Sequence, residues 1–274
     1  MTQTDHAGHI VSDADFRLFQ RLFDDSIGLN LTSHKKLLLS GRLGKRVAKL
    51  GLSGFHEYYQ HLASGKDPEE FQLAIDLITT HETFFFRENH HFHLLRDKIA
   101  PEAPSGRNLR VWSAACSTGE EAWSIAMVLR HVLGVTGWTL VASDVSRSVV
   151  VKAARGLYAM DRISGIPPEY LKAYCLKGQK EYEGMLLVER SLRDMVDFHT
   201  VNLLEIPPEF KEFDVVFLRN VIIYFDAPTK ERVLRSVCQT IRPDGWLLLG
   251  HSESLAGMDL PLRQIRPSVY RRTN

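Results

Sequence analysis

Arg110-Val-Trp-Ser-Ala-Ala-Cys-Ser-Thr-Gly-Glu-Glu-Ala-Trp-Ser124 is the stretch that decides the fold of this chain. Its first residues predict a short strand, its small residues predict a tight loop, and its last residues begin a helix that runs to about Leu133. In an open α/β sheet, a strand that feeds a helix through small residues brings backbone N–H groups up to a ligand. The stretch therefore predicts the first strand, loop and helix of such a sheet.

A second apolar run, Thr139–Ser143, ends in Asp144, 25 residues after Gly119. This spacing fits an acid at the tip of the second strand, where its carboxylate can accept hydrogen bonds from the hydroxyls of a ribose. The loop contains no Gly-x-Gly-x-x-Gly pattern, which argues against a dinucleotide with its pyrophosphate. A nucleoside without phosphate, such as S-adenosylmethionine, fits better.

Length and composition limit the class of protein. With 274 residues, of which 44% are apolar and 24% charged, the chain has room for one large domain and one small one. The net charge of +1 implies no overall attraction to nucleic acid or anionic membrane. The three cysteines have neither a disulfide framework nor zinc spacing, which suits a reducing compartment. Without a signal peptide or a long apolar run, the sequence predicts a cytoplasmic protein that does not insert into a membrane.

The beginning of the chain is predicted to be helical. Apolar residues recur at helical spacing from Phe16 onward, and further helices are expected at about 33–50, 53–63 and 68–79. No strand pattern occurs before residue 108. We therefore expect a small all-helical domain over residues 1–85, followed by an α/β domain over residues 86–274.

The helix expected at 33–50 has two distinct stripes of side chains. The apolar stripe should face its own domain and consists of Leu39, Leu43, Val47 and Leu50. The basic stripe beside it should face outward and consists of Lys35, Arg42, Arg46 and Lys49. From the pattern alone, a basic stripe is more often a solvated face than a binding surface.

The segment Thr79-Thr-His-Glu-Thr-Phe-Phe-Phe-Arg-Glu88 breaks the helical period. One interpretation is a domain junction in which Phe84 and Phe86 are buried. The other is a site in which the aromatic residues hold Arg87 at a cleft. The sequence supports both interpretations equally.

Three histidines, His90, His91 and His93, follow on a helix expected at about 90–100. They lack the i, i+4 pairing with a carboxylate that a helical zinc site uses. We therefore interpret them as surface histidines and expect no metal.

The rest of the chain alternates predicted strands and helices, which implies a mostly parallel sheet with right-handed crossovers. Phe213–Leu218 has the strongest pattern of a buried strand. Weaker strand patterns are found at Val196–Val201, at Trp246–Gly250 and within Leu262–Arg271. Pro243–Gly245 is expected to form a turn. Met185–Arg190 is assigned to a small antiparallel β insert at about 175–197.

Polar residues gather where the predicted strands end: Asp144, Asn202, Arg219, Asn220 and His251. The carboxyl ends of parallel strands form the ligand-binding edge of such a sheet. Any single one of these residues could be a helix cap or an ordinary loop residue. Five together indicate a ligand site.

Five motifs occur in a fixed order along the chain: Thr80-His-Glu-Thr-Phe-Phe-Phe-Arg-Glu88, Trp112–Glu121, Ala142–Asp144, Val201–Leu203 and Arg219–Phe225. In this order they resemble the CheR family, the chemoreceptor glutamate O-methyltransferases that use S-adenosylmethionine. The resemblance covers nearly the whole chain. It implies a Rossmann-like S-adenosylmethionine methyltransferase sheet with a small β insert, preceded by a small all-helical domain.

The family pattern also implies which residues form the site. The residues implied to hold the cofactor are His81, Thr83, Arg87, Glu121, Asp144, Asn202, Leu203, Arg219 and Asn220. Arg87 and Tyr224 are implied to be catalytic, beside the reacting centre. The sequence departs from the pattern at two places. His81 stands where the family usually has Asn, which puts that contact in doubt, and Ala122-Trp123 replaces the usual Pro-Tyr.

The implied reaction transfers a methyl group from S-adenosylmethionine to glutamate side chains of chemoreceptors, which gives glutamyl methyl esters and S-adenosylhomocysteine in chemotactic adaptation. A glutamate side chain is already ionised at neutral pH, so no general base is needed. The implied partners are the cytoplasmic methylation helices of the receptors and, on the helical domain, regulatory proteins. With such a partner, the basic stripe is interpreted as a docking surface of a monomeric enzyme that binds no nucleic acid.

Two other functions were weighed against this one. An RNA or DNA N-methyltransferase would carry an (Asn/Asp)-Pro-Pro-(Tyr/Phe) loop, but Arg219–Tyr224 contains no proline. An inactive module that only senses S-adenosylmethionine would have lost the residues at the reacting centre, but Arg87 and Tyr224 are present. Some family members also grip a peptide at the receptor's C-terminus through the β insert. The loop Gly178–Gly184 is less glycine-rich here than in those relatives, which argues weakly against such a tether.

Overall fold

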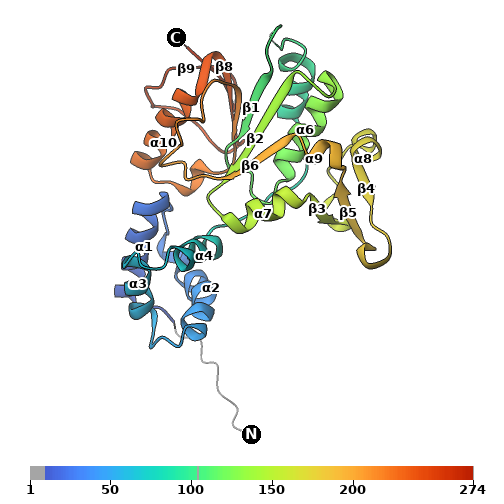
Figure 1. Cartoon of the computed structure of the whole chain (residues 1–274). Coiled ribbons are helices and arrows are strands. Elements are labelled where there is room, and N and C mark those ends of the chain that lie inside the picture. Colours follow the sequence, from blue (N-terminus) through green and yellow to red (C-terminus); the bar gives the residue numbers. More distant parts are fainter. Residues whose placement is uncertain (1–9, 104, 274) are drawn as a thin grey trace. The chain divides into compact units, whose positions relative to one another are not determined.

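The computed structural model describes residues 10–103 and 105–273, and the chain forms two units (Figure 1). The first unit comprises the chain up to Thr80 together with Tyr224–Asp226. The second unit comprises His81–Ile223 and the chain from Ala227 onward. The boundary lies earlier than the one expected at residue 85. The sequence did not predict that Tyr224–Asp226 would belong to the helical unit.

The first unit is helical, as expected. Its elements are α1 (Asp13–Ile27), the 3-10 turn η1 (Ser33–Lys35), α2 (Lys36–Lys49), α3 (Phe55–Ala63) and α4 (Pro68–Ile78). The Ser12 hydroxyl accepts a hydrogen bond from the Asp15 N–H at 3.0 Å and caps α1. Asp67 caps α4 in the same way, accepting from the Glu70 N–H at 3.0 Å. Short polar side chains at these positions therefore fix where two of the helices begin.

The expected apolar stripe of α2 forms part of the core of this unit. Leu39, Leu43 and Val47 are at most 1% exposed, whereas Leu50 is 38% exposed. Leu50 lies one residue after the end of α2, where the helical periodicity that predicted its burial no longer applies. The stripe is thus confirmed at three of its four positions.

The basic stripe differs from the expectation that it faces outward. The Arg42 Nη1 donates to the carbonyl oxygens of residues 77–79 at 3.2, 3.0 and 2.7 Å, and so binds the end of α4. The Arg46 Nε donates to the Glu70 Oε1 at 2.9 Å, and the Arg46 side chain is only 15% exposed. The outward orientation was therefore wrong for Arg46, and Arg42 is bound within the unit as well.

We expect Glu70→Gln to lower the free energy of unfolding by about 3 kcal/mol at pH 7, because it breaks a buried pair. Glu70 is 5% exposed and accepts hydrogen bonds from Arg46 and from the Tyr58 hydroxyl, the latter at 2.7 Å. Burial alone would raise the pKa of Glu70, but Arg46 and Tyr58 lower it below its usual value of 4.5. Its contribution is therefore fully present above that value and is lost as the pH falls through the lowered pKa.

Urea unfolding at several pH values would test this prediction. The difference between wild type and Glu70→Gln should be largest near neutral pH and should shrink in acid. Glu69→Gln, at the exposed preceding position of α4, serves as the matched control. An equal effect of both substitutions, or a difference that is independent of pH, would contradict it.

The second unit contains a seven-stranded sheet in the order β6-β2-β1-β7-β8-β10-β9. The strands are β1 (Leu109–Ser113), β2 (Trp138–Asp144), β6 (Val196–Thr200), β7 (Phe213–Leu218), β8 (Ile241–Leu249), β9 (Leu262–Arg266) and β10 (Val269–Arg272). The first five strands in the order pair in parallel, and β10 pairs antiparallel with both β8 and β9. The mostly parallel sheet is confirmed. Its five carboxyl-terminal strand ends lie along one edge.

Helices connect and cover these strands. They are α5 (His90–Leu94) with a π-helical turn η2 (Leu95–Ile99), α6 (Glu120–Leu133), α7 (Arg147–Arg155), α8 (Pro168–Tyr174), α9 (Arg190–Arg193) and α10 (Ala227–Thr240), with 3-10 turns η3 (Met160–Arg162), η4 (Lys180–Tyr182) and η5 (Ile222–Tyr224). Helix α6 packs on β2 and α10 packs on β8. Within the described residues, no helix is long and apolar enough to span a membrane.

A second, antiparallel sheet in the order β3-β5-β4 forms the insert, beside the main sheet (Figure 1). Its strands are β3 (Leu157–Ala159), β4 (Cys175–Lys177) and β5 (Met185–Val188). The insert therefore begins before the expected residue 175, while β6 belongs to the main sheet. Strand β3 was missed because three residues are too few to show a periodic pattern.

The end of the chain differs from its prediction in two details. Pro243–Gly245 lies inside β8, where Phe213 pairs with Ile241 but Val215 already pairs with Trp246, so the expected turn is a bulge in the strand. The single strand expected within Leu262–Arg271 is a hairpin, β9 and β10.

Candidate cofactor site

The loop between β1 and α6 has room only for glycine at position 119. Gly119 has a φ of 97°, and a Cβ there would lie 2.7 Å from the Ala153 Cβ and 2.8 Å from the Tyr158 Oη. The Cys116 N–H donates to the Ser143 carbonyl at 2.8 Å and ties this loop to β2. The loop is thus held tightly against β2 and α7, with α6 starting directly behind it.

Asp144 ends β2 and is 8% exposed. Its Oδ2 accepts from the Ser117 N–H at 2.9 Å, and its Oδ1 accepts from the Ser146 N–H at 3.0 Å. A carboxylate oxygen can accept more than one hydrogen bond, so these contacts are compatible with binding a ribose as well. The Val201 N–H donates to the Asp144 carbonyl at 2.9 Å, which brings Asn202 to the same sheet edge.

Arg219 follows β7, and its side chain is 1% exposed. Its Nη1 lies 3.0 Å from the Glu121 Oε2, and its Nη2 donates to the Arg87 carbonyl. Glu121 also accepts from the Ser113 hydroxyl at 2.7 Å. Burial raises the pKa of Glu121, and Arg219 and Ser113 oppose this rise without cancelling it. Three of the predicted site residues therefore lie in one cluster.

Glu88 is a member of this cluster that the prediction missed. Its Oε2 lies 3.2 Å from the Arg219 Nη2 and accepts from the His251 N–H at 3.0 Å, and its Oε1 accepts from the Asn220 Nδ2 at 3.3 Å. Burial alone would raise the pKa of Glu88, but His251, Arg219 and Asn220 hold it below its usual value. Its position at the end of the motif that begins at Thr80 was the available sequence signal.

The aromatic segment before Glu88 combines parts of both interpretations. Phe85 and Phe86 are 1% and 6% exposed, whereas Phe84 is 51% exposed, so the interpretation as a junction with both Phe84 and Phe86 buried holds for Phe86 only. The Arg87 guanidinium lies 5.7 Å from the Phe84 ring centroid, and its Nη1 donates to the Glu82 carbonyl at 2.9 Å. Arg87 is thus flanked by an exposed aromatic ring while Phe86 packs in the core.

Thr83, His81 and Leu203 lie on the segments that carry the other site residues. The Thr83 carbonyl accepts from the Arg162 Nη2 at 3.2 Å, and the same atom of Arg162 pairs with the buried Glu120. Leu203 is 7% exposed, and His81 is half-buried. The contact of His81 with the cofactor remains a prediction.

Tyr224 belongs to the helical unit and not to the unit that contains Arg87. The Asn30 N–H donates to the Tyr224 carbonyl at 2.9 Å, and the Lys35 Nζ lies 5.2 Å from the centroid of its ring. Burial and the nearby Arg42 lower the pKa of Lys35. Lys35 therefore lies against the tyrosine, which the basic-stripe pattern did not predict.

Of the three histidines, His91 is fully buried, so its interpretation as a surface residue was wrong. Its Nε2 lies 3.0 Å from the Ser268 Oγ, and burial lowers its pKa to about 2, which keeps it neutral. Glu88, His90 and His91 place potential ligand atoms within 4.8 Å of one another. The Glu88 carboxylate is already bound by Arg219, whose positive charge opposes a second cation. We therefore assign no metal to this group.

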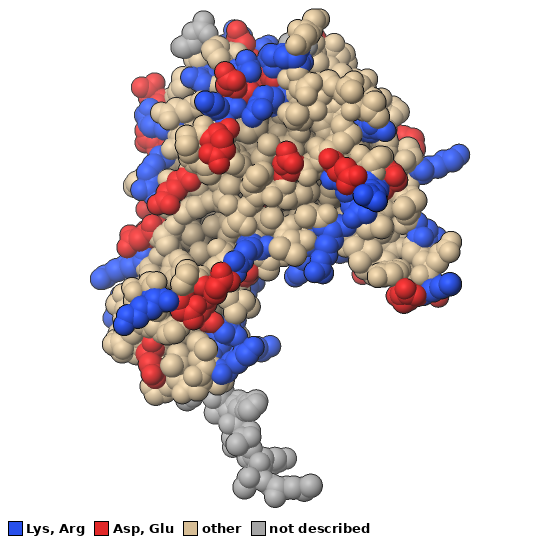
Figure 2. All heavy atoms as spheres, viewed as in Figure 1, with Lys and Arg blue, Asp and Glu red and all other residues tan. Residues whose placement is uncertain are grey.

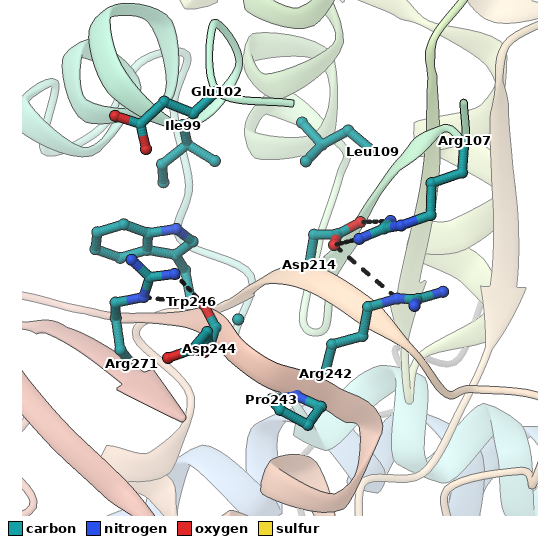
Figure 3. Close-up of a pocket in the computed structure, with 11 residues that line it drawn as sticks. Ile99, Glu102, Arg107, Leu109, Asp214, Arg242, Pro243, Asp244, Trp246 and Arg271 are labelled. Atoms are coloured by element: carbon teal, nitrogen blue, oxygen red, sulfur yellow. Dashed lines mark hydrogen bonds and ion pairs between the residues drawn. The ribbon is translucent and has the colours of Figure 1, made fainter. Parts of the chain in front are cut away.

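A hollow at the amino-terminal ends of β1 and β7 has a volume of about 230 Å³ (Figure 3). Arg107 pairs with Asp214 across it through two hydrogen bonds of 2.8 and 2.6 Å, and the Arg271 Nε donates to the Asp244 carbonyl at 2.9 Å. These two arginines of the hollow are thus already bound by other residues that line it. It also lies at the sheet edge opposite to Asp144, so we do not assign the cofactor to it.

The residues at the carboxyl-terminal edge fit S-adenosylmethionine. The Ser117 Oγ and the Arg219 Nε are buried and have no hydrogen-bond partner within the described part of the chain. Buried polar atoms are normally satisfied, which suggests that a ligand supplies the missing partners. Asp144, Glu121 and Glu88 suit ribose hydroxyls and the positive ammonium and sulfonium groups, and Arg219 suits a carboxylate.

The second unit is an open α/β sheet with an acid at the tip of β2 and a glycine loop without a phosphate motif. Polar side chains cluster where its strands end. Together these features define an S-adenosylmethionine-dependent methyltransferase. Comparison with known families shows which kind of methyltransferase it is. Residues 81–270 match the family model described as the CheR methyltransferase SAM binding domain, and residues 14–79 match the CheR methyltransferase all-alpha domain. The chain belongs to the CheR methyltransferase family.

Relatives with curated names agree with this assignment. The chemotaxis protein methyltransferase of Escherichia coli (strain K12) is 40% identical over 266 residues, 95% of this chain and 91% of that protein. Chemotaxis protein methyltransferase 2 of Pseudomonas aeruginosa (strain PAO1) is 38% identical over 93% of this chain and 92% of that protein. The chemotaxis protein methyltransferase of Borreliella burgdorferi is 34% identical over 96% of this chain and 95% of that protein.

Proposed function

We propose that the protein transfers the methyl group of S-adenosylmethionine to glutamate side chains of bacterial chemoreceptors. The observation that carries the proposal is the match of both CheR domains, in order, over residues 14–79 and 81–270. The products are glutamyl methyl esters and S-adenosylhomocysteine. Each transfer removes one negative charge from the receptor, which alters how its helices pack and serves chemotactic adaptation.

The residues of the site are proposed to act by binding and orientation. S-adenosylmethionine, when bound, supplies an electrophilic methyl group. Asp144 accepts from the ribose, and Arg219, Glu121, Asn202 and Asn220 hold the remainder of the cofactor. A glutamate carboxylate is ionised at neutral pH, so the enzyme needs no group to remove a proton.

Arg87 and Tyr224 are proposed to complete the catalytic site. The guanidinium of Arg87 offers directional hydrogen bonds to the substrate carboxylate, and the Tyr224 hydroxyl fixes one of its oxygens. Their contribution is the in-line alignment of that oxygen with the methyl group and the exclusion of water, which would otherwise solvate the nucleophile.

Incubation with methyl-labelled S-adenosylmethionine would test the proposal. We expect base-labile label on cytoplasmic receptor fragments and none on fragments whose methylated glutamates are replaced by alanine. RNA and DNA should remain unlabelled. Label on nucleic acid would instead support an N-methyltransferase, and cofactor binding without any transfer would support an inactive sensor.

The helical unit is proposed to dock the receptor. Lys35, Arg42, Arg46 and Lys49 were predicted for this role, but of these four residues only Lys49 is exposed. Lys45 and Leu37 are also exposed on α2, and Leu37 is 70% exposed. Figure 2 shows both signs of charge interspersed on the face that it draws, so any basic docking surface on that face is local. We infer that Lys45 and Lys49 carry the attraction to an acidic receptor helix.

We expect Lys45→Glu with Lys49→Glu to raise KM for receptor fragments about tenfold, with kcat and cofactor affinity unchanged, because exposed charges act mainly on encounter. The activity of the double variant should also fall less steeply with salt than that of wild type. Lys152→Glu with Lys172→Glu makes the same charge change at exposed positions of the second unit and is the matched control. If both double variants behave alike, the lysines of α2 are only a solvated face.

A further inference from the structure

Glu253 lies at the tip of β8 and is 4% exposed, yet neither the motifs nor the proposed mechanism gives it a role. We propose that Glu253 is a positioning residue for the cofactor site: its carboxylate fixes the turn from Arg219 to Ile223, which presents Arg219 and Asn220. The inference rests on the proposed function of those two residues as cofactor contacts. Glu253 acts on them through the backbone.

The carboxylate of Glu253 is surrounded by backbone N–H groups. Its Oε2 accepts from the Gly250 N–H at 2.7 Å and from the Asn220 N–H at 2.8 Å, and its Oε1 accepts from the Ile222 N–H at 2.9 Å. The backbone N–H of Ile223 also lowers the pKa of this carboxylate. Both oxygens are therefore needed as acceptors. A glutamine has one acceptor oxygen, and its NH2 group would face N–H donors.

The turn that these bonds hold has an unfavourable backbone conformation. Asn220 has a φ of 56°, in the left-handed region, which asparagine adopts more often than other residues with a Cβ but still as an exception. Such a conformation persists only where the surrounding structure over-determines it, and such residues cluster at functional sites. The bonds to Glu253 on both sides of residue 221 supply that constraint.

Gly250 makes the close approach between the β8 tip and this turn feasible. A Cβ at Gly250 would lie 2.5 Å from the Asn220 Nδ2, 2.9 Å from the Asn220 backbone N and 2.9 Å from the Glu253 Oε2. The Asn220 Nδ2 is the group that donates to Glu88 in the Arg219 cluster. The segment Gly250–Glu253 thus determines where the Asn220 side chain and backbone lie.

The adjacent strands transmit this placement to Arg219. Leu218, the last residue of β7, pairs with Leu249, the last residue of β8. Arg219 and Gly250 therefore leave the sheet at the same level, and Glu253 closes the loop between them. Burial raises the pKa of Glu253 while the backbone N–H groups oppose the rise, which is consistent with an enclosed carboxylate.

Calorimetric titration with S-adenosylmethionine tests the inference on the full chain. For Glu253→Gln we expect the dissociation constant to rise about tenfold, the scale of one lost net hydrogen bond, and kcat to fall, with KM for receptor fragments unchanged. Gly250→Ala disturbs the same turn without changing Glu253 and should have the same effects. Ser252→Ala, at an exposed position between them, is the matched control and should behave as wild type.

A purely structural role would give a different pattern. Both variants would then unfold at lower urea concentration, yet would bind the cofactor and turn over as wild type under conditions where they are folded. That result overturns the inference. If Glu253→Gln does not fold, Glu253→Asp, which keeps both acceptor oxygens on a shorter side chain, takes its place, and unchanged cofactor affinity and kcat in that variant overturn the inference.

Arg219→Met separates this inference from the proposed function. If Arg219→Met leaves cofactor affinity unchanged, the proposed role of Arg219 fails. If Arg219→Met weakens affinity while Glu253→Gln and Gly250→Ala do not, only the positioning role fails. If the roles of Arg219 and Glu253 are both confirmed, adding Glu253→Gln to Arg219→Met should cost less cofactor affinity than Glu253→Gln costs in the wild type. The reason is that both changes act through the Arg219 side chain.

Discussion

Gly119→Ala is expected to lower the free energy of unfolding by about 2–4 kcal/mol and to abolish measurable cofactor binding, because strain and overpacking act together. The added Cβ would lie 2.7 Å from the Ala153 Cβ and 2.9 Å from the Ala153 Cα, so backbone must move. The φ of 97° is also unfavourable for alanine. The displaced loop carries the Ser117 N–H that donates to Asp144.

Gly51→Ala is the matched control for this prediction. Gly51 lies two residues after the end of α2, has a φ of 66°, and has open space where a Cβ would be placed. It therefore carries the cost of a positive φ without the clash. Urea unfolding and calorimetry of both variants would measure the difference, and equal losses would show that the contact with Ala153 is unimportant.

Asp144→Ala is expected to cost about 2–3 kcal/mol of S-adenosylmethionine affinity, since it removes two acceptors for the ribose hydroxyls. The structure adds a second reason, because Asp144 also accepts from the Ser117 and Ser146 N–H groups and so shapes two loops. Asp144→Asn retains one acceptor oxygen and should lose less affinity than Asp144→Ala.

Calorimetry on folded protein would check this order of affinities. Asp197→Ala, at an exposed position on the neighbouring strand β6, is the matched control and should bind as wild type. Unchanged affinity in folded Asp144→Ala would remove Asp144 from the cofactor site.

The sequence predicted well those features that depend on local patterns. The apolar run of β7 and the strand, loop and helix around Gly119 are encoded by neighbouring residues, and periodicity is sufficient to find them. The five polar residues at strand ends were found for the same reason. Chain direction in a parallel sheet brings all carboxyl ends to one edge.

The errors occurred where a tertiary partner decides the role of a residue. Arg46 belongs to a basic stripe by spacing, but Glu70, 24 positions later, binds it inside the unit. His91 looks like its exposed neighbours in sequence, but its ring is buried in the core, where it contacts the distant Ser268. Glu88 ends the motif that begins at Thr80 and Glu253 follows the end of β8, but only the folded loops show which N–H groups they bind. Local sequence does not contain this information.

The assignment of Tyr224–Asp226 to the helical unit has a consequence for dissecting this enzyme into fragments. A chain that starts at His81 keeps Asp144, Arg219 and Glu121, which are proposed to hold the cofactor. It also keeps Tyr224 but loses Asn30 and Lys35, which contact that tyrosine. Such a fragment would therefore test cofactor binding separately from the helical unit. Its turnover would be a poor guide to that of the intact enzyme, because the missing helices contribute contacts to Tyr224 that a division of the chain at residue 80 removes.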